Sequence, residues 1–269
     1  MKIKPIINCC LMAAKRKLYN PARKNAIMVL LRKLALKYPK WGYRKMQVLL
    51  NQAGHAIGKH KTRELMTKLG LIIKQKVKSG RSNSPISVRP NLTKHLKASR
   101  KDEVWFADIT CIKTKCGRDV YVALVMDGYS RRIIGRAESY RQDVHLVLKA
   151  FRMAMRRRMP RPGVIHHSDQ GSQYTSAAYI RELKRNGFQV SFSKKGFPYD
   201  NGIMERLMNT LKHEEVYLWE YATIKDVRNG IRRFIAVYNN NRPHAALGYI
   251  TPCQYEVLFT ASFSGSVIP

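Results

Sequence analysis

The chain has 269 residues, with 51 Lys and Arg against 17 Asp and Glu, and a formal net charge of +34. Hydrophobic residues make up 45% of it, which is enough for a packed core and excludes wholesale disorder. A charge this large indicates a polyanionic partner, with nucleic acid as the first candidate and an anionic membrane surface as the second. No apolar run approaches the roughly 18–20 residues of a membrane span, so no membrane segment is predicted.

The positive charge is concentrated in the first part of the chain. Residues 1–100 hold 25 Lys and Arg and a single acid, Glu64, whereas residues 101–269 hold 26 basic residues and 16 acids. The first part is therefore predicted to bind a polyanion, and the acids of the second need a separate explanation. The five cysteines form no C-x-x-C pair and are odd in number, which favours a reducing compartment and a cytoplasmic protein.

Three amphipathic helices are predicted in the basic part. The first covers residues 24–38, and two shorter helices, in WGYRKMQVLLNQAG and GKHKTRELMTKLGL, flank a turn at 53–58 with glycines at or beside its ends. This pattern is typical of a helix-turn-helix that presents its second helix to DNA, although a basic helical bundle with a solvated face is the alternative. The predicted buried seam is Val48, Leu49, Leu65, Met66 and Leu69, and the predicted DNA contacts are Lys59, Lys61, Arg63 and Lys68.

A change of pattern follows. Residues 74–101 are basic, lack acids and contain two prolines, so they are interpreted as a linker that lies along a nucleic-acid backbone. From residue 102 the alternation becomes strand-like, and the predicted order is β-β-β-α-β-α-β-α-α. Strands are expected within 103–115, 119–130, 131–140, 163–169 and 188–193, and helices at 142–159, 176–187, about 201–219 and up to about 239. This order favours an α/β fold, a mixed sheet with helices on its faces.

Three acids occupy notable positions on this map. Asp108 lies within the first strand, Asp169 follows the fourth, and Glu205 is in the first turn of a later helix. Carboxylates that crowd together raise one another's pKa unless a cation holds them, and oxygen ligands favour Mg²⁺ or Mn²⁺. Two such ions about 3.5–4 Å apart clamp the attacking and leaving oxygens of a phosphodiester. A metal site for nucleic-acid chemistry is one interpretation of the three acids.

Each acid also has a simpler interpretation. Asp108 could be an edge or turn residue, Asp169 could cap the next helix, and Glu205 could complement the helix dipole. Asp127 is the chief rival carboxylate, although an Asp-Gly turn explains it more simply. Neighbouring side chains on a strand point in opposite directions, so HHSD is not expected to form a Ser-His-Asp triad. His167 within it is expected to contact a phosphate or stabilise the strand end.

Several motifs together resemble one family. WFADIT, HHSDQGSQYTS and DNGIMERLMNTLK resemble the DDE motifs of integrase-core transposases, and 35 residues separate Asp169 from Glu205, as in the retroviral integrase superfamily. YPKWGYRKMQVLLNQAG with KHKTRELMTKLGL, and YNNNRPHAALGYITP, resemble the N-terminal helix-turn-helix and the C-terminal block of bacterial OrfB-type insertion-sequence transposases. The resemblance covers roughly residues 25–258. Gly202 and Arg206 depart from it, standing where alanine and serine are common.

The resemblance implies a ribonuclease-H-like five-stranded core in which Asp108, Asp169 and Glu205 bind Mg²⁺ or Mn²⁺, as two ions. It divides the chain into a helical DNA-binding domain (1–73), a basic linker (74–101), a catalytic core (102–220) and a C-terminal helical extension (221–269). Further candidate DNA contacts follow the metal ligands. Asn209 and Lys212 stand four and seven residues after Glu205, on the same helix face, and the last motif supplies Arg242 and His244.

The implied function is DNA transposition by an insertion-sequence transposase: binding of element ends, metal-dependent cleavage and strand transfer. The implied partners are DNA, further copies of the chain in a homo-oligomeric DNA complex, and a protein from an upstream reading frame. The implied location is the bacterial cytoplasm, at the nucleoid. A non-catalytic relative that only binds element ends and a ribonuclease-H-type nuclease remain as alternatives.

Overall fold

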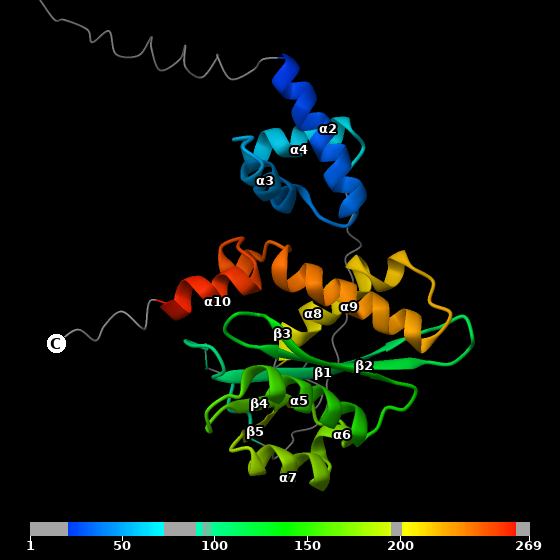
Figure 1. The fold of residues 1–269 in the computed structure, drawn as a ribbon, viewed down its shortest axis with the longest axis vertical. Coiled ribbons are helices and arrows are strands. Elements are labelled where there is room, and N and C mark those ends of the chain that lie inside the picture. The colour runs from blue at the N-terminus through cyan, green and yellow to red at the C-terminus, as the bar shows by residue number, and fades with distance from the viewer. Residues whose placement is uncertain (1–20, 73–89, 94–95, 97, 195–200, 262–269) are drawn as a thin grey trace, which may run out of the picture. The chain divides into compact units, whose positions relative to one another are not determined.

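The computed structural model describes residues 21–72, 90–93, 96, 98–194 and 201–261 (Figure 1). The chain divides into two compact units, Met1–Lys76 and Val77–Pro269, which are treated separately below. Most of the predicted linker, 74–89, lies outside the described residues, so the four-part division of the chain stays a prediction. None of the helices in the described ranges combines the length and apolar character needed to cross a bilayer.

The N-terminal unit is helical, as predicted. It contains α2 (Pro21–Lys37), α3 (Tyr43–Gln52) and α4 (Lys59–Lys68). In the turn between α3 and α4, Gly54 has φ +82°, a conformation that glycine adopts without the steric cost of a Cβ. The ring of Tyr38, just after α2, stacks on Trp41 at a centroid distance of 3.9 Å. The apolar core between the helices comprises Ile27, Leu31, Trp41, Met46, Leu50, Leu65 and Met66.

The predicted seam was partly wrong on α3. Leu65 and Met66 are buried as predicted, but Val48 and Leu49 are only half-buried. Met46 and Leu50, one helical turn apart, face the core instead. Leu69, which follows the end of α4, is also half-buried. The error is one of helical phase, because an apolar run of three or more residues does not by itself say which residues face inward.

The second unit is a five-stranded mixed sheet with helices on both faces, which confirms the predicted fold class. The strand order is β3-β2-β1-β4-β5; the β3-β2 and β2-β1 pairs are antiparallel, and β1-β4 and β4-β5 are parallel. The strands are β1 (Val104–Ile112), β2 (Val120–Asp127), β3 (Ile133–Ser139), β4 (Ile165–Ser168) and β5 (Gln189–Phe192). The helices are α5 (Val144–Arg158), α6 (Ser172–Thr175), α7 (Ala177–Arg185), α8 (Gly202–Glu214), η2 (Val216–Leu218), α9 (Ile224–Asn240), η3 (Ala245–Leu247) and α10 (Pro252–Ala261).

The sheet separates two apolar cores. Because side chains alternate along a strand, Trp105 and Ala107 of β1 enter the core under α5 and α7, while Val104 and Phe106 enter the core under α8 and α9. Figure 1 shows α8 and α9 on one face of the sheet and α5, α6 and α7 on the other. By the same alternation, Asp108 shares the face of Val104 and Phe106. The first strand therefore directs this carboxylate toward α8.

One predicted boundary differs in the structure: the predicted helix 201–219 ends at Glu214 and is followed by the 3-10 turn η2. Pro252 begins α10, and Thr251 Oγ1 accepts from the Gln254 amide at 3.2 Å. The last residues of the predicted linker contact the sheet: Pro90 accepts from the Phe192 amide at 3.0 Å. An edge strand offers unpaired backbone groups, which explains why the chain settles there.

A buried ionic cluster ties α10 to the sheet. Arg158, at the end of α5, donates to Glu256 of α10 at 2.7 and 2.9 Å and to Asp102 at 2.8 Å. Asp127 is fully buried beside them and accepts from the amide and hydroxyl of Ser130 at 2.7 and 2.8 Å. Burial raises the pKa of Asp127, and Arg158 and these hydrogen bonds act against the rise. The Asp-Gly turn is thus held by a carboxylate whose bonding capacity is used inside the protein.

Replacing Asp127 with Asn tests this structural role. The variant leaves Arg158 short of one neighbouring charge in a buried setting, and we expect it to lower the free energy of unfolding by about 3 kcal/mol. Urea denaturation followed by circular dichroism measures the change. A loss below about 0.5 kcal/mol, the usual range of surface substitutions, would contradict the assigned role.

Two glycines give a matched test of packing. A Cβ on Gly135 of β3 would lie 2.3 Å from the Ala150 carbonyl oxygen of α5, whereas a Cβ on Gly202 would meet nothing within 4 Å. Gly135→Ala should therefore destabilise the protein by about 1–3 kcal/mol. Gly202→Ala should be neutral or stabilise it by about 0.5 kcal/mol, because it restricts the unfolded chain. Equal effects of the two substitutions on thermal melting would refute this account.

Candidate active site

The parallel pairing of β1 with β4 places Asp108 and Asp169, the first two predicted acids, next to each other. Phe106 pairs with His167, and continuing this register by two residues places Asp108 beside Asp169. Asp169 is the first residue beyond β4, where the chain leaves the sheet, and its exposed side chain is free of strand packing. The parallel pairing of the first and fourth strands therefore brings these two acids next to each other.

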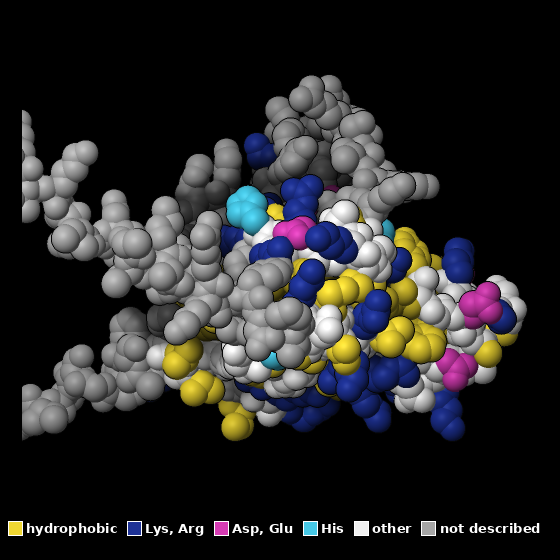
Figure 2. Space-filling view, turned by 90° about the horizontal axis from the view of Figure 1, so that it is seen from above, with side chains coloured by type: hydrophobic (Ala, Val, Ile, Leu, Met, Phe, Trp, Pro, Cys, Tyr) yellow, Lys and Arg dark blue, Asp and Glu magenta, His cyan; other side chains and the backbone are white. Residues whose placement is uncertain are grey.

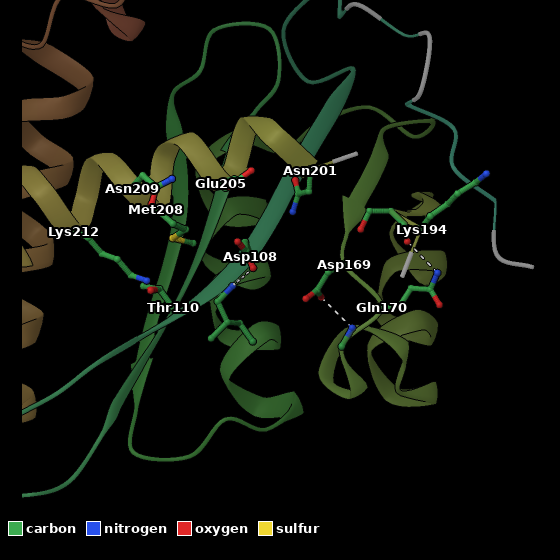
Figure 3. A pocket seen from close by; sticks show the side chains of 13 residues that line it. Asp108, Thr110, Asp169, Gln170, Lys194, Asn201, Glu205, Met208, Asn209 and Lys212 are labelled. Carbon is green, nitrogen blue, oxygen red and sulfur yellow. Dashed lines mark hydrogen bonds between the residues drawn. The ribbon is translucent and has the colours of Figure 1, made fainter. Parts of the chain in front are cut away.

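Glu205 reaches the same place from α8. This helix packs on the sheet through a buried apolar face, which leaves its other side turned outward. Figure 3 shows Asp108, Asp169 and Glu205, from three different elements, around one pocket of about 620 Å³. The apolar face of α8 comprises Met204, Leu207, Met208 and Leu211. The pocket is lined by Asp108, Ile109, Thr110, Asp169, Gln170, Gly171, Ser193, Lys194, Asn201, Glu205, Met208, Asn209 and Lys212.

The three carboxylates interact electrostatically. Burial is the largest cause that raises the pKa of Asp108 to about 7, and the neighbouring charges of Asp169 and Glu205 contribute to this rise. The Ile109 amide, which donates to Asp108 Oδ1 at 2.8 Å, and the charge of Lys212 act in the opposite direction. The pocket therefore brings three carboxylates together, with the charge of Lys212 only partly offsetting theirs at Asp108.

The bonding capacity of these carboxylates is largely unused. Asp169 Oδ1 accepts from the Gly171 amide at 3.0 Å, and the exposed carboxylate of Glu205 has no hydrogen-bond or ion-pair partner in the described part of the chain. Oxygen donors with spare lone pairs fit a hard cation such as Mg²⁺ or Mn²⁺. As the side chains lie, no three His, Cys, Asp or Glu groups among the described residues are close enough to hold one ion. Binding would require rotation of the carboxylates toward each other.

The rival residues lie elsewhere. Asp127 is not among the residues that line the pocket, and its place in the buried cluster supports the Asp-Gly turn interpretation. His167 is fully buried and its Nδ1 bonds Ser191 Oγ at 2.8 Å and Thr93 Oγ1 at 3.1 Å, which supports the interpretation that it stabilises the strand end. Ser168 donates to the Asp169 carbonyl oxygen. The HHSD residues form no triad.

The further predicted contacts divide into two groups. Asn209 and Lys212 line the pocket beside Glu205, as their helical spacing predicted. Arg242 instead forms a two-pronged ion pair with Glu214 at 2.8 Å and is largely buried, while the half-buried His244 stands edge-on to Tyr238. This placement gives Arg242 a structural role, joining the end of α9 to α8.

Several pocket residues escaped the sequence analysis. Thr110 and Asn201 flank Asp108, and Gln170 and Lys194 lie near Asp169 (Figure 3). Thr110 carried a usable signal, because it stands two residues after Asp108 on the same strand face. The other three come from loops or helix ends, where spacing does not predict direction.

In the N-terminal unit, α4 presents the four predicted basic residues unequally. Lys61 and Lys68 form ion pairs with Glu64 at 2.7 and 3.0 Å, and their hydrogen bonds lower the pKa of Glu64 to about 2. Lys59 and Arg63 are exposed. Because Glu64 partly neutralises two of the four cations, Lys59 and Arg63 are the better placed for a polyanion.

Basic side chains also spread over the surface. Figure 2 shows Lys and Arg distributed over the face in view, with few Asp and Glu among them, in keeping with the net charge of +34. A surface of one sign attracts a polyanion over distances of about one Debye length.

Comparison with protein families identifies both units. Two models described as Integrase core domain match residues 98–198 and 186–252, and a model described as HTH-like domain matches residues 22–79. Among solved structures, the chain resembles the catalytic core domain of BIV integrase at 17% identity and a TM-score of 0.46, over 61% of this chain and 99% of that one. A likeness of that size decides nothing by itself, and the sequence relatives carry the assignment.

Those relatives are encoded by bacterial insertion sequences. The chain is 36% identical over 222 residues to the transposase for insertion sequence element IS904 of Lactococcus lactis, covering 81% of this chain and 87% of that protein. It is 35% identical to the insertion element IS600 31 kDa protein of Shigella sonnei, over 80% of this chain and 81% of that protein. It is also 30% identical to the transposase for insertion sequence element IS629 of Shigella sonnei, over 82% and 75%. The chain therefore belongs to the family of insertion-sequence transposases, with an HTH-like domain ahead of an integrase core.

Proposed function

We propose that this transposase binds the ends of its element through the N-terminal unit and cuts and joins DNA strands at the pocket of Asp108, Asp169 and Glu205. The observation that supports this most directly is the convergence of the three carboxylates, from β1, the loop after β4 and α8, on one pocket. The electrostatic coupling of Asp108 with the other two supports it further. The reaction class is attack of water or a DNA 3′-hydroxyl on a phosphodiester.

The three carboxylates would hold Mg²⁺ or Mn²⁺, as two ions. When bound, the metal supplies charge stabilisation for the attacking and leaving oxygens of the phosphodiester. The chain's own contribution is to anchor Asp108 and Glu205 through packed elements of the core. Asp108 is held by strand pairing, and Glu205 by the packing of α8, so neither depends on a loop for its position.

Lys212 and Asn209 would position the DNA at this pocket. Both lie on the face of α8 that carries Glu205, and the charge of Lys212 already reaches Asp108. A lysine there would pair with a backbone phosphate and an asparagine would donate to a phosphate or sugar oxygen, contacts that fix the register of DNA without reading its sequence.

One incubation separates the three functions considered. Purified protein is mixed with labelled duplex from the element's end and Mg²⁺, and the products are resolved on a denaturing gel. The proposed transposase joins the labelled strand to a second duplex. Binding without cleavage would favour the non-catalytic relative, and cleavage restricted to the RNA strand of a hybrid would favour the nuclease.

Assembly and location complete the proposal. Joining both element ends in one reaction requires at least two copies of the catalytic site, so we infer a homo-oligomer in the DNA complex. An upstream-frame partner protein, and a place in the bacterial cytoplasm at the nucleoid, follow from the same functional assignment.

Glu205→Gln is expected to reduce Mg²⁺-dependent strand transfer by more than about 100-fold, the scale of losing one preorganised electrostatic group. It keeps the shape of the side chain but removes a charge from a group that repels its neighbours in the metal-free protein. The melting temperature without metal should therefore stay the same or rise slightly. If Glu205 only complements the dipole of α8, the variant should instead lose about 0.3–1 kcal/mol of stability.

Asp127→Asn is the matched control for that experiment. It removes one carboxylate charge from the same domain, but from the buried cluster and outside the pocket. Under conditions where it is folded, it should keep strand transfer and its Mg²⁺ requirement. Normal transfer by Glu205→Gln together with loss in Asp127→Asn would reverse the assignment of the third metal ligand.

Lys59→Gln and Arg63→Gln test the DNA contacts of α4. Each neutralised phosphate contributes about −0.9 to the slope of log affinity against log salt concentration, so each variant should make that slope shallower by roughly one unit. Fluorescence anisotropy with element-end DNA at several salt concentrations measures it. Lys68→Gln is the comparison, because Lys68 is paired with Glu64 and should change the slope less. Equal slope changes in all three variants would contradict the inference that Lys59 and Arg63 are better placed for DNA than Lys68.

A further inference from the structure

Asn201 occupies the N-cap position of α8 but does not cap the helix. Asparagine is among the best N-cap residues because its side-chain oxygen accepts a hydrogen bond from a first-turn amide. In α8 that bond is absent, whereas the N-caps of α7 and α9, Ser176 and Thr223, both make it. The Asn201 side chain therefore lacks the capping hydrogen bond that its position normally favours.

The side chain turns to the sheet instead. Asn201 Nδ2 donates to the Ala107 carbonyl oxygen at 3.4 Å, next to Asp108, and the residue is 8% exposed. This bond assigns the amide, because a carbonyl cannot accept from the amide oxygen. Within the described ranges, Asn201 Oδ1 is left buried with no hydrogen-bond partner. Figure 3 shows Asn201 at the pocket, beside Asp108 and Glu205.

An unpaired buried carbonyl oxygen is unfavourable, and here it adds to the lost cap. Two local costs at one residue are typical of a position maintained for function. The chemistry of Asn201 Oδ1 limits which ligand group it can bind. Oδ1 can only accept, so it is repelled by the oxygens of a phosphate and attracted to an O–H group.

We propose that Asn201 Oδ1 accepts the O–H of the attacking water or DNA 3′-hydroxyl and orients that nucleophile toward the scissile phosphorus. This inference rests on the proposed function. In the step, the nucleophile's oxygen forms the new P–O bond and the P–O bond to the leaving oxygen breaks. The nucleophile's proton passes to solvent and the leaving oxygen takes one up; the amide exchanges no proton. Asn201 thereby acts by orientation, while its Nδ2 holds β1 next to Asp108.

Asn201→Ser separates this role from a structural one. Serine is a good N-cap for α8 but is too short to serve both Ala107 and the pocket. We expect an unchanged or higher melting temperature together with a loss of strand transfer of about 100-fold, the scale of misplacing a reactant by an ångström. The Mg²⁺ concentration for half-maximal rate should not change. With glycerol added as an alternative nucleophile, the ratio of glycerol ester to hydrolysis product should shift.

Two further variants complete the test. Asn201→Asp keeps an acceptor oxygen in the same shape but loses the donor to the Ala107 carbonyl and adds a charge to the pocket, so it should be at least as impaired as Asn201→Ser. Thr223→Ala is the matched control, since it removes the capping bond of α9 outside the pocket; it should lower the melting temperature and leave transfer and nucleophile choice unchanged.

The proposal is overturned if Asn201→Ser transfers strands within about twofold of wild type with an unchanged product ratio, or if extra Mg²⁺ restores its rate, which would make Oδ1 a metal ligand. It is also overturned if Asn201→Asp transfers strands as well as wild type, because the amide and its bond to Ala107 would then not be needed. Failure of the wild-type protein to join strands would instead refute the proposed function. The two failures are therefore distinguishable.

Discussion

The parallel pairing of β1 with β4 is the constraint on which the site depends. Once Phe106 is opposite His167, Asp108 and Asp169 come level, although 60 residues separate them along the chain. Parallel neighbours need a long crossover, and here β2, β3 and α5 supply it. The same crossover provides the apolar layer under the sheet, so the elements that stabilise the core are those that bring the two acids together.

The site also requires a helix that buries one face against the sheet and leaves its other face exposed. The apolar side chains of α8 and α9 form one core with the outer face of β1 and β2. This leaves Glu205, Asn209 and Lys212 on a face of α8 that borders the pocket. The predicted C-terminal extension therefore does more than follow the core, because α9 covers the same sheet face and supports α8.

Acids are scarce in this chain, and the structure uses them in two distinct ways. One set, including Asp127, Glu256 and Glu214, is paired with arginine and joins elements that are distant in sequence. The other set, in the pocket, has little internal pairing, and burial and mutual repulsion raise the pKa of Asp108 to about 7. A paired acid joins elements of the fold, whereas the pocket acids keep oxygen lone pairs that could bind a cation. The partner, more than the residue type, decides the role of each acid.

The sequence by itself determined the fold class, the three acids and the basic character of the N-terminal unit. Strand alternation, helical spacing and the motifs around Asp108, Asp169 and Glu205 are local patterns. Such patterns can be recognised from the sequence without the structure. Only the tertiary structure decided which α3 residues face the core, that Arg242 pairs with Glu214, and that Asp127 belongs to a buried cluster. It also revealed the place of Asn201 at the pocket, which no pattern in the sequence singled out. These outcomes depend on contacts between residues that are distant in sequence. A side chain such as that of Asn201 can bond either to its own helix or to a distant strand, and only the folded structure shows which bond forms.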